Sequence, residues 1–175
     1  MRSETSNQGD RLANALRFLG VNFIAADQDI PETIHKHPAR LIKALVQSKE
    51  ARLRLSIIPL FLDHPEFASY LPKITRTLDP SELLILECYY TAALFFQKKF
   101  SSVVEIKQNL RDLFSDDLGL EQYSDLDVSL KTLAARHQVL SQSSVNWLGT
   151  YQHAAQIWLR DKTNNTVKNG SFSIS

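Results

Sequence analysis

Residues 79–99 read DPSELLILECYYTAALFFQKK. They begin like a helix, because an Asp side chain accepts hydrogen bonds from free N–H groups, proline tolerates the first turn, and Glu82 suits the positive end of the helix dipole. The residues that follow are apolar nearly all round the expected helix. A helix of that kind is one that other elements surround. We therefore predict that this helix, ending near Lys99, forms the core and joins the two halves of the chain.

The composition indicates one globular domain. The chain has 175 residues, of which 43% are hydrophobic and 22% charged. A chain of this size buries about 70% of its unfolded surface, so it needs no disulfide or metal to fold. The single cysteine, Cys88, lies in an apolar run, and we expect a buried structural thiol. No signal-peptide core and no run of about 18 apolar residues is seen, so we expect a cytoplasmic protein without membrane contact.

Prolines divide residues 9–78 into short helices. We expect helical pieces at about Asp10 to Ile24, from Asp29, at Ala39 to Gln47, at Lys49 to Leu62 with a kink at Pro59, and after His64. The polar, aperiodic residues 1–8 and 163–175 are predicted to be mobile tails. Residues 9–162 then form a single helical domain.

Two amphipathic helices and a hairpin are predicted after the core helix. Ser102 and Glu105 form a capping-box pattern, which starts a helix ending at Phe114. A second helix is expected from Asp125 to Gln138. The apolar period then shortens to two around a polar turn, which is typical of a hairpin, before a final helix at 146–162. The fold class predicted is therefore mainly α, a compact helical domain with a small β-hairpin near residues 139–150.

This order of elements, over residues 79–151, resembles the winged helix-turn-helix superfamily of bacterial regulators. The resemblance implies that the second short helix enters the major groove of double-stranded DNA, that the hairpin touches the backbone, and that the protein is a homodimer. The outward positions of that helix would then read base edges: Lys131, Thr132, Ala135 and Gln138. The chain departs from the pattern in the long acidic connection 115–124 and in a hairpin without Lys or Arg. The alternative is a pair of helices whose connecting loop happens to alternate.

A basic segment offers a second candidate surface. Residues 36–54 contain six Lys or Arg against one acid, a net charge of +5. Arg40 and Lys43 share one face of their expected helix, and Arg52 and Arg54 follow after a turn. The segment is either an anion-binding patch, for nucleic acid or an acidic protein, or a solvated helix face. It lacks the interleaved aromatic residues on which single-strand binders stack bases.

The sequence shows no catalytic motif. His35 and His37 lack the spacing and the partners of a zinc site, five glycines leave little material for a phosphate loop, and no Gly-x-Ser-x-Gly elbow occurs. We therefore predict a non-catalytic regulatory protein that acts by binding, without cofactor or metal. The first version is a DNA-binding transcriptional regulator that uses Asp125 to Gln138.

The second version is a protein-interaction adaptor, or an antitoxin-like accessory partner of another protein. An adaptor needs an exposed apolar patch larger than a few hundred Å². We expect such a patch around Phe61, Phe67 and Tyr70.

Overall fold

The structure is a computed structural model that describes residues 2–24 and 33–170. Most of these residues are helical. No strand occurs in these residues. In chain order, with η marking 3₁₀ turns, the segments are α1 (Arg2–Phe18), η1 (Ile34–Lys36), α2 (Pro38–Gln47), α3 (Ala51–Leu55), α4 (Ile57–Asp63), η2 (Pro65–Tyr70), α5 (Leu71–Thr75), α6 (Pro80–Phe100), α7 (Leu126–Ser141) and α8 (Trp147–Gly170).

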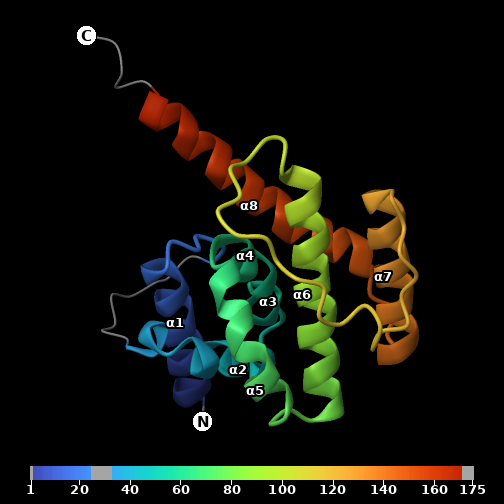
Figure 1. The fold of residues 1–175 in the computed structure, drawn as a ribbon. Helices are drawn as coiled ribbons and strands as arrows, with labels where there is room; N and C mark the ends of the chain where they lie inside the picture. The colour runs from blue at the N-terminus through green and yellow to red at the C-terminus, as the bar shows by residue number, and fades with distance from the viewer. Residues whose placement is uncertain (1, 25–32, 171–175) are drawn as a thin grey trace.

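Helix α6 lies in the middle of the molecule, as its sequence predicts. The helices α1 to α5 lie on one side of it, with α2 and α4 in contact with it, α7 packs on the other side, and α8 crosses behind (Figure 1). Every residue from Cys88 to Gln97 is buried. The predicted start is confirmed as a capping box, because Asp79 accepts the Glu82 N–H at 2.8 Å and the Glu82 carboxylate accepts the Asp79 N–H at 3.1 Å. This helix therefore holds the two halves of the chain in one core.

The predicted first helix, at 10–24, ends earlier than expected, at Phe18. Gly20 adopts a φ of 77°, a left-handed conformation that favours glycine. The Val21 N–H then donates to the Leu16 carbonyl at 2.9 Å, which closes the last turn. The chain therefore turns away here. The helix start expected from Asp29 lies outside the described residues.

The predicted helix at 49–62 is two helices, α3 and α4, parted at Ser56. Pro59 has no N–H to donate to the Leu55 carbonyl, and its ring crowds that carbonyl. The helix is therefore interrupted in the turn before Pro59, and the kink predicted at Pro59 is replaced by this break. The prediction for α2 is confirmed, since α2 spans Pro38–Gln47.

The helix predicted at 102–114 is wrong. Residues 101–125, which we call the strap, contain no regular helix or strand and cross the front of α6 before reaching α7 (Figure 1). Three apolar side chains of the strap are buried: Leu110, Phe114 and Leu118. Connections longer than about 12–15 residues without secondary structure are uncommon in compact domains and are usually functional.

Side chains of α6 form hydrogen bonds with backbone groups of the strap, which would be paired with one another if the strap were a helix. The Gln97 amide donates to the Gln108 carbonyl at 2.9 Å and accepts the Leu110 N–H at 2.8 Å. The Tyr90 hydroxyl donates to the Arg111 carbonyl at 2.8 Å. These long-range bonds satisfy the backbone in an extended form, which local sequence signals do not register.

The hairpin predicted near residues 139–150 is also wrong. Helix α7 continues to Ser141 and ends because Gln142 adopts a left-handed φ of 53°. Asn146 then accepts the Gly149 N–H at 3.0 Å with its side chain, and α8 begins at Trp147. The described residues therefore contain no wing. The order of elements on which the winged-helix resemblance rested is replaced by a helical hairpin, whose first helix was predicted.

Both ends of the described chain are more helical than predicted. Helix α1 begins at Arg2, and α8 continues to Gly170, through part of each segment expected to be a tail. Tyr151 and Trp158 are both buried on the inner side of α8, while its last turns project from the body (Figure 1). In the part of the chain that is described, no helix has the length and apolar character needed to cross a membrane.

Candidate binding surfaces

A chain of buried polar groups joins α6, α7 and α8. The Tyr151 hydroxyl and His137 Nδ1 lie 2.5 Å apart, and the Cys88 thiol is hydrogen-bonded to the same hydroxyl. The Trp147 ring stacks on the imidazole, with ring centres 3.6 Å apart. Burial lowers the pKa of His137 to about 4. Burial and the nearby Glu87 charge raise the pKa of the Cys88 thiol to about 12.

These groups are enclosed. Cys88 and Tyr151 are 0% exposed and His137 is 1% exposed. The neutral imidazole and the protonated thiol are out of reach of solvent. Their contacts with Tyr151 join α6, α7 and α8, so we assign them a structural role. The expectation of a buried structural thiol at Cys88 is confirmed, and His137 lies on the apolar side of α7.

Glu87, next to this cluster on α6, gives the protein a pH-dependent stability. Burial, and then repulsion from Asp117, raise the pKa of its carboxyl from 4.5 to about 7. The folded protein therefore binds this proton more tightly than the unfolded chain does. The stability that the protonated Glu87 carboxyl contributes is fully present below about pH 4.5 and is lost as the pH rises to about 7.

We expect Glu87→Gln to raise the melting temperature at pH 8 and to change it little at pH 4.5, because glutamine cannot ionise. Thermal unfolding at the two pH values, beside Asp117→Asn as a smaller effect in the same direction, measures this. A shift of equal size at both pH values would show that the ionisation of Glu87 does not set the effect.

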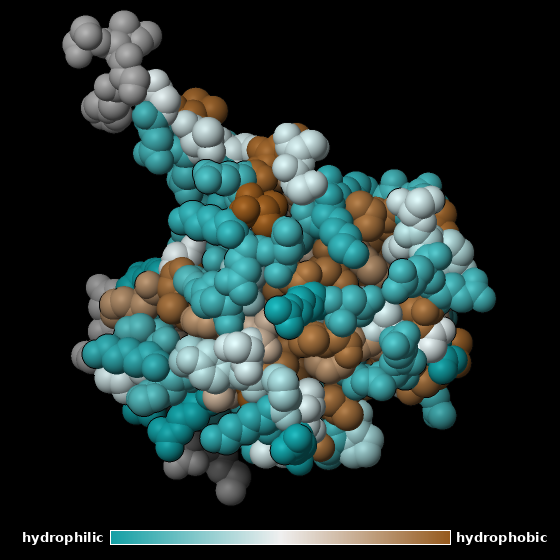
Figure 2. All heavy atoms as spheres, in the orientation of Figure 1, coloured by the Kyte–Doolittle hydropathy of each residue, from teal (hydrophilic) through white to brown (hydrophobic). Residues whose placement is uncertain are grey.

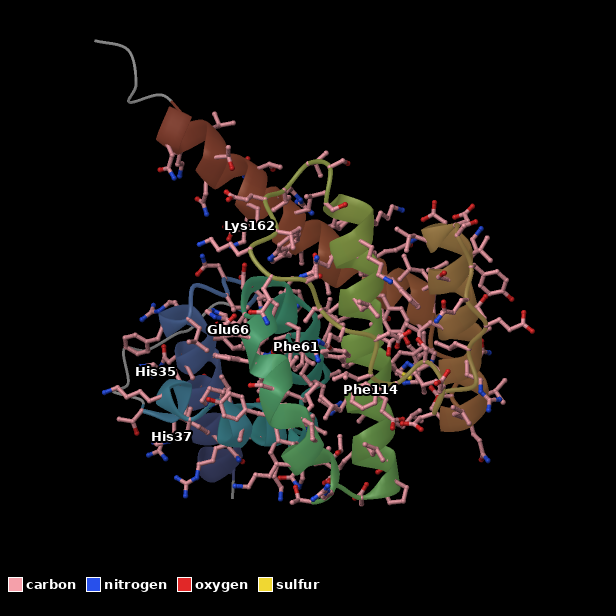
Figure 3. The ribbon with its side chains drawn as sticks, in the orientation of Figure 1. His35, His37, Phe61, Glu66, Phe114 and Lys162 are labelled. Atoms are coloured by element: carbon pink, nitrogen blue, oxygen red, sulfur yellow. The ribbon has the colours of Figure 1, made fainter. Side chains whose placement is uncertain are left out.

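A groove runs between the strap on one side and α4 and η2 on the other. It consists of two cavities of about 390 and 340 Å³ that share Pro65 and Gln108 in their linings. Figure 2 shows hydrophobic residues exposed between polar ones on the front of the molecule, below the projecting end of α8. Asp63 on α4 and Lys162 on α8 line its upper end (Figure 3).

Two of the charged side chains in the groove, Asp63 and Lys162, are paired with each other. The Asp63 carboxylate forms an ion pair with Lys162 and accepts the Trp158 indole N–H at 3.0 Å. The Asp63 side chain is only 8% exposed. This arrangement ties α4 to α8 at that end of the groove.

The outer side of α7 carries the residues that were predicted to face outward. Lys131, Ala135 and Gln138 are exposed, and Thr132 is partly exposed. Val128 and Val139 lie among them, 38% and 66% exposed. We call the whole set the α7 face: Val128, Lys131, Thr132, Ala135, Gln138 and Val139.

The middle of the α7 face is aliphatic. At 100° per residue, Val128, Ala135 and Val139 fall within about 40° of one another. Leu140 and Val145 extend the apolar area, at 41% and 44% exposed. Exposed acidic residues lie at its N-terminal end, Asp125 and Asp127, and on the strap that runs beside α7, Asp116, Asp117 and Glu121. The face is therefore apolar with a negative rim.

The predicted basic residues separate into two groups. Arg40 is exposed and Lys43 partly exposed on the outer side of α2, whose inner side is buried. Arg52 pairs with Glu50 at 2.8 Å. Arg54 donates to the Ser48 carbonyl at 2.6 Å and so closes the end of α2. Of these four predicted residues, Arg40 and Lys43 are therefore the two that form a basic surface on α2.

The apolar patch predicted around Phe61, Phe67 and Tyr70 is wrong. Phe61 is 0% exposed and meets the Tyr90 ring edge-on, with centres 5.0 Å apart, and Phe67 is also buried. Figure 3 shows Phe61 between α4 and α6. Short apolar helices do not reveal which side faces the core, and here α4 is buried on all sides by α6 and α8. Tyr70 alone is exposed, at 41%.

Comparison of the chain with known protein families, with curated proteins and with solved structures finds no match. Two surfaces are left as candidates: the apolar α7 face with its negative rim, and the basic outer side of α2. They lie on opposite sides of α6 (Figure 1). Their different chemistry suits different partners.

Proposed function

We propose that the protein is a non-catalytic adaptor that binds another protein through the α7 face. The observation that carries this proposal is the exposure of Val128 and Val139 on one line of the helix, with Ala135 between them. An outer helix side is normally polar, and clustered exposed apolar side chains mark interaction sites. The strap places Tyr123, 40% exposed, beside Thr132 of this face.

The charge of the α7 face favours a protein over DNA as its partner. DNA binding requires Lys and Arg to neutralise phosphates. Lys131 is the one cation among the residues of the α7 face, the adjacent Arg136 donates to the Leu118 carbonyl, and Lys99 is paired with Asp127. The acidic rim would repel a duplex and attract a protein whose apolar surface is bordered by Lys and Arg. In this proposal the chain is an adaptor, or an antitoxin-like accessory partner, of such a protein.

The shape of the face suits a helix of the partner. Ala135 lies at its centre, with Thr132 and the two valines around it. Small side chains in the middle of a helix surface let a second helix approach closely, and the larger aliphatic ones at either end fill the grooves between its ridges.

We expect Val128→Asp with Val139→Asp to weaken capture of the partner by roughly tenfold or more, because both charges would be desolvated in the interface core. The test compares the intact protein, this double variant and Arg40→Gln as a control, each immobilised and exposed to an extract of the native host. Both aspartates replace exposed side chains, so the melting temperature should stay close to that of the parent protein.

The same three proteins, with Lys131→Ala, are titrated with duplex DNA at low salt. One discrete protein retained by the parent and the control but lost by the double variant would support the proposal. Equal capture by the double variant would contradict it. Duplex binding that is lost in Lys131→Ala would also contradict it and favour the DNA-binding alternative.

A further inference from the structure

We propose that a hollow at the start of α2 binds a nucleotide unit, with its phosphate held by Lys36 and Arg40 and its base stacked on Tyr70. The hollow has a volume of about 270 Å³, and the three residues line it together with His37, Pro38 and Ala39. It lies on the opposite side of α6 from the α7 face (Figure 1), so it is independent of the function proposed above.

The hollow lies in a positive field. Lys36 and Arg40 are both exposed, and in the described part of the chain neither forms an ion pair within 4.0 Å. The sequence has no acid from residue 33 to residue 49, nor from 67 to 78. Lys43 follows Arg40 one turn along α2, and the helix α5, which contacts α2, carries the exposed Lys73. Unpaired cations concentrated in this way attract phosphate.

The backbone at this point adds donors to the cations. Pro38 occupies the first turn of α2, and the His37 side chain makes no capping bond. The N–H groups of the first helical turn have no partner within the helix, so they are available to an anion. His37 itself is exposed at the rim of the hollow (Figure 3), where its imidazole adds a further donor.

Tyr70 supplies the aromatic surface that the sequence around Arg40 lacks. Its side chain is 41% exposed, and its ring meets Phe67 edge-on at 6.3 Å, which holds it in place. Stacking of a base on an aromatic ring strengthens binding by about tenfold or more and tolerates any base. A duplex keeps its bases stacked inside, so only a single strand or a free nucleotide offers a base to Tyr70. The fold thus joins a basic segment and an aromatic residue that are far apart in the sequence.

The test is the fluorescence anisotropy of a labelled ten-residue oligothymidylate at low salt. We expect Tyr70→Ala to weaken binding about tenfold, as the loss of one stacked base implies. Arg40→Gln with Lys36→Gln should weaken binding further and make the salt dependence shallower by about 0.7 per lost phosphate contact. Arg52→Gln is the matched control, because Arg52 is an exposed cation outside the hollow, and it should change binding little.

Unlabelled competitors distinguish the source of the nucleotide unit. Competition by an unlabelled oligothymidylate alone assigns the site to nucleic acid, and competition by thymidine monophosphate at similar concentration assigns it to free nucleotides. Either result supports the proposal. Absence of binding at low salt, equal loss in Arg52→Gln, unchanged binding in Tyr70→Ala, or equal competition by inorganic phosphate would each overturn it. The α7 double variant should bind the strand like the parent protein, so failure here is distinguishable from failure of the adaptor proposal.

Discussion

Replacing His137 by alanine is expected to lower the free energy of unfolding by about 3–5 kcal/mol, the range for removal of a buried aromatic side chain. The imidazole is 1% exposed and stacks on Trp147, so its loss opens a cavity between α7 and α8. The Tyr151 hydroxyl also loses its partner on α7. Equilibrium denaturation in urea, followed by tryptophan fluorescence and circular dichroism, measures the change.

His137→Phe is the matched control, because it keeps a ring against Trp147 and removes only the hydrogen bond. Its expected loss is about 1 kcal/mol, the net contribution of one hydrogen bond, because the Tyr151 hydroxyl keeps its contact with the Cys88 thiol. A loss below about 1 kcal/mol in His137→Ala would mean that the α7–α8 hairpin is not held by this cluster.

Asp63→Ala is expected to cost about 2–3 kcal/mol of unfolding free energy, below the 3–5 kcal/mol of a fully buried pair. The carboxylate holds both Trp158 and Lys162 of α8, and removing it leaves an indole N–H and an ammonium group without their acceptor. The expected value is reduced because the Lys162 side chain stays 34% exposed and water takes over part of its charge.

Asp63→Asn separates the two contacts, since its amide oxygen still accepts the Trp158 N–H while the ion pair with Lys162 is lost. We expect it to cost less than half as much as the alanine variant. Equal losses in the two variants would assign the whole effect to the ion pair. The same urea titrations measure both.

The helices that were predicted correctly are those whose signals are local. The capping residues Asp79 and Glu82, and then a run of apolar side chains, define α6 without reference to the rest of the chain. Asp125 likewise accepts the N–H groups of Asp127 and Val128 and starts α7. A cap and an apolar run therefore located α6, and the amphipathic pattern from Asp125 to Gln138 located α7.

The strap was not predictable in this way, because Gln97 and Tyr90 of α6 hold its backbone from outside the segment. The capping-box pattern at Ser102 and Glu105 does not start a helix, because these bonds from α6 hold the strap in an extended form. The wrongly predicted hairpin has a different cause. Apolar and polar residues alternate after Val139, but these residues are the last turn of α7 and the left-handed Gln142 that ends it. Over so few residues, this alternation resembles that of a strand.

The candidate surfaces were predictable only in part. The outward direction of Lys131 and of Arg40 follows from helical periodicity and is confirmed. The apolar character of the α7 face could have been recognised from Val128 and Val139, which share that outward side. The contact of Tyr70 with the hollow at Arg40 could not, because it depends on how η2 packs against α2.

The central claim is that the α7 face binds a protein, and site-specific photo-crosslinking in the native host tests it most directly. A photoreactive phenylalanine analogue is placed at Val139, which is 66% exposed, and at Val167 on the projecting end of α8, which is 70% exposed, as a control. We expect one discrete adduct of higher mass from Val139 and none from Val167. The absence of an adduct from Val139, or the same adduct from both positions, would contradict the claim that the α7 face is the docking surface.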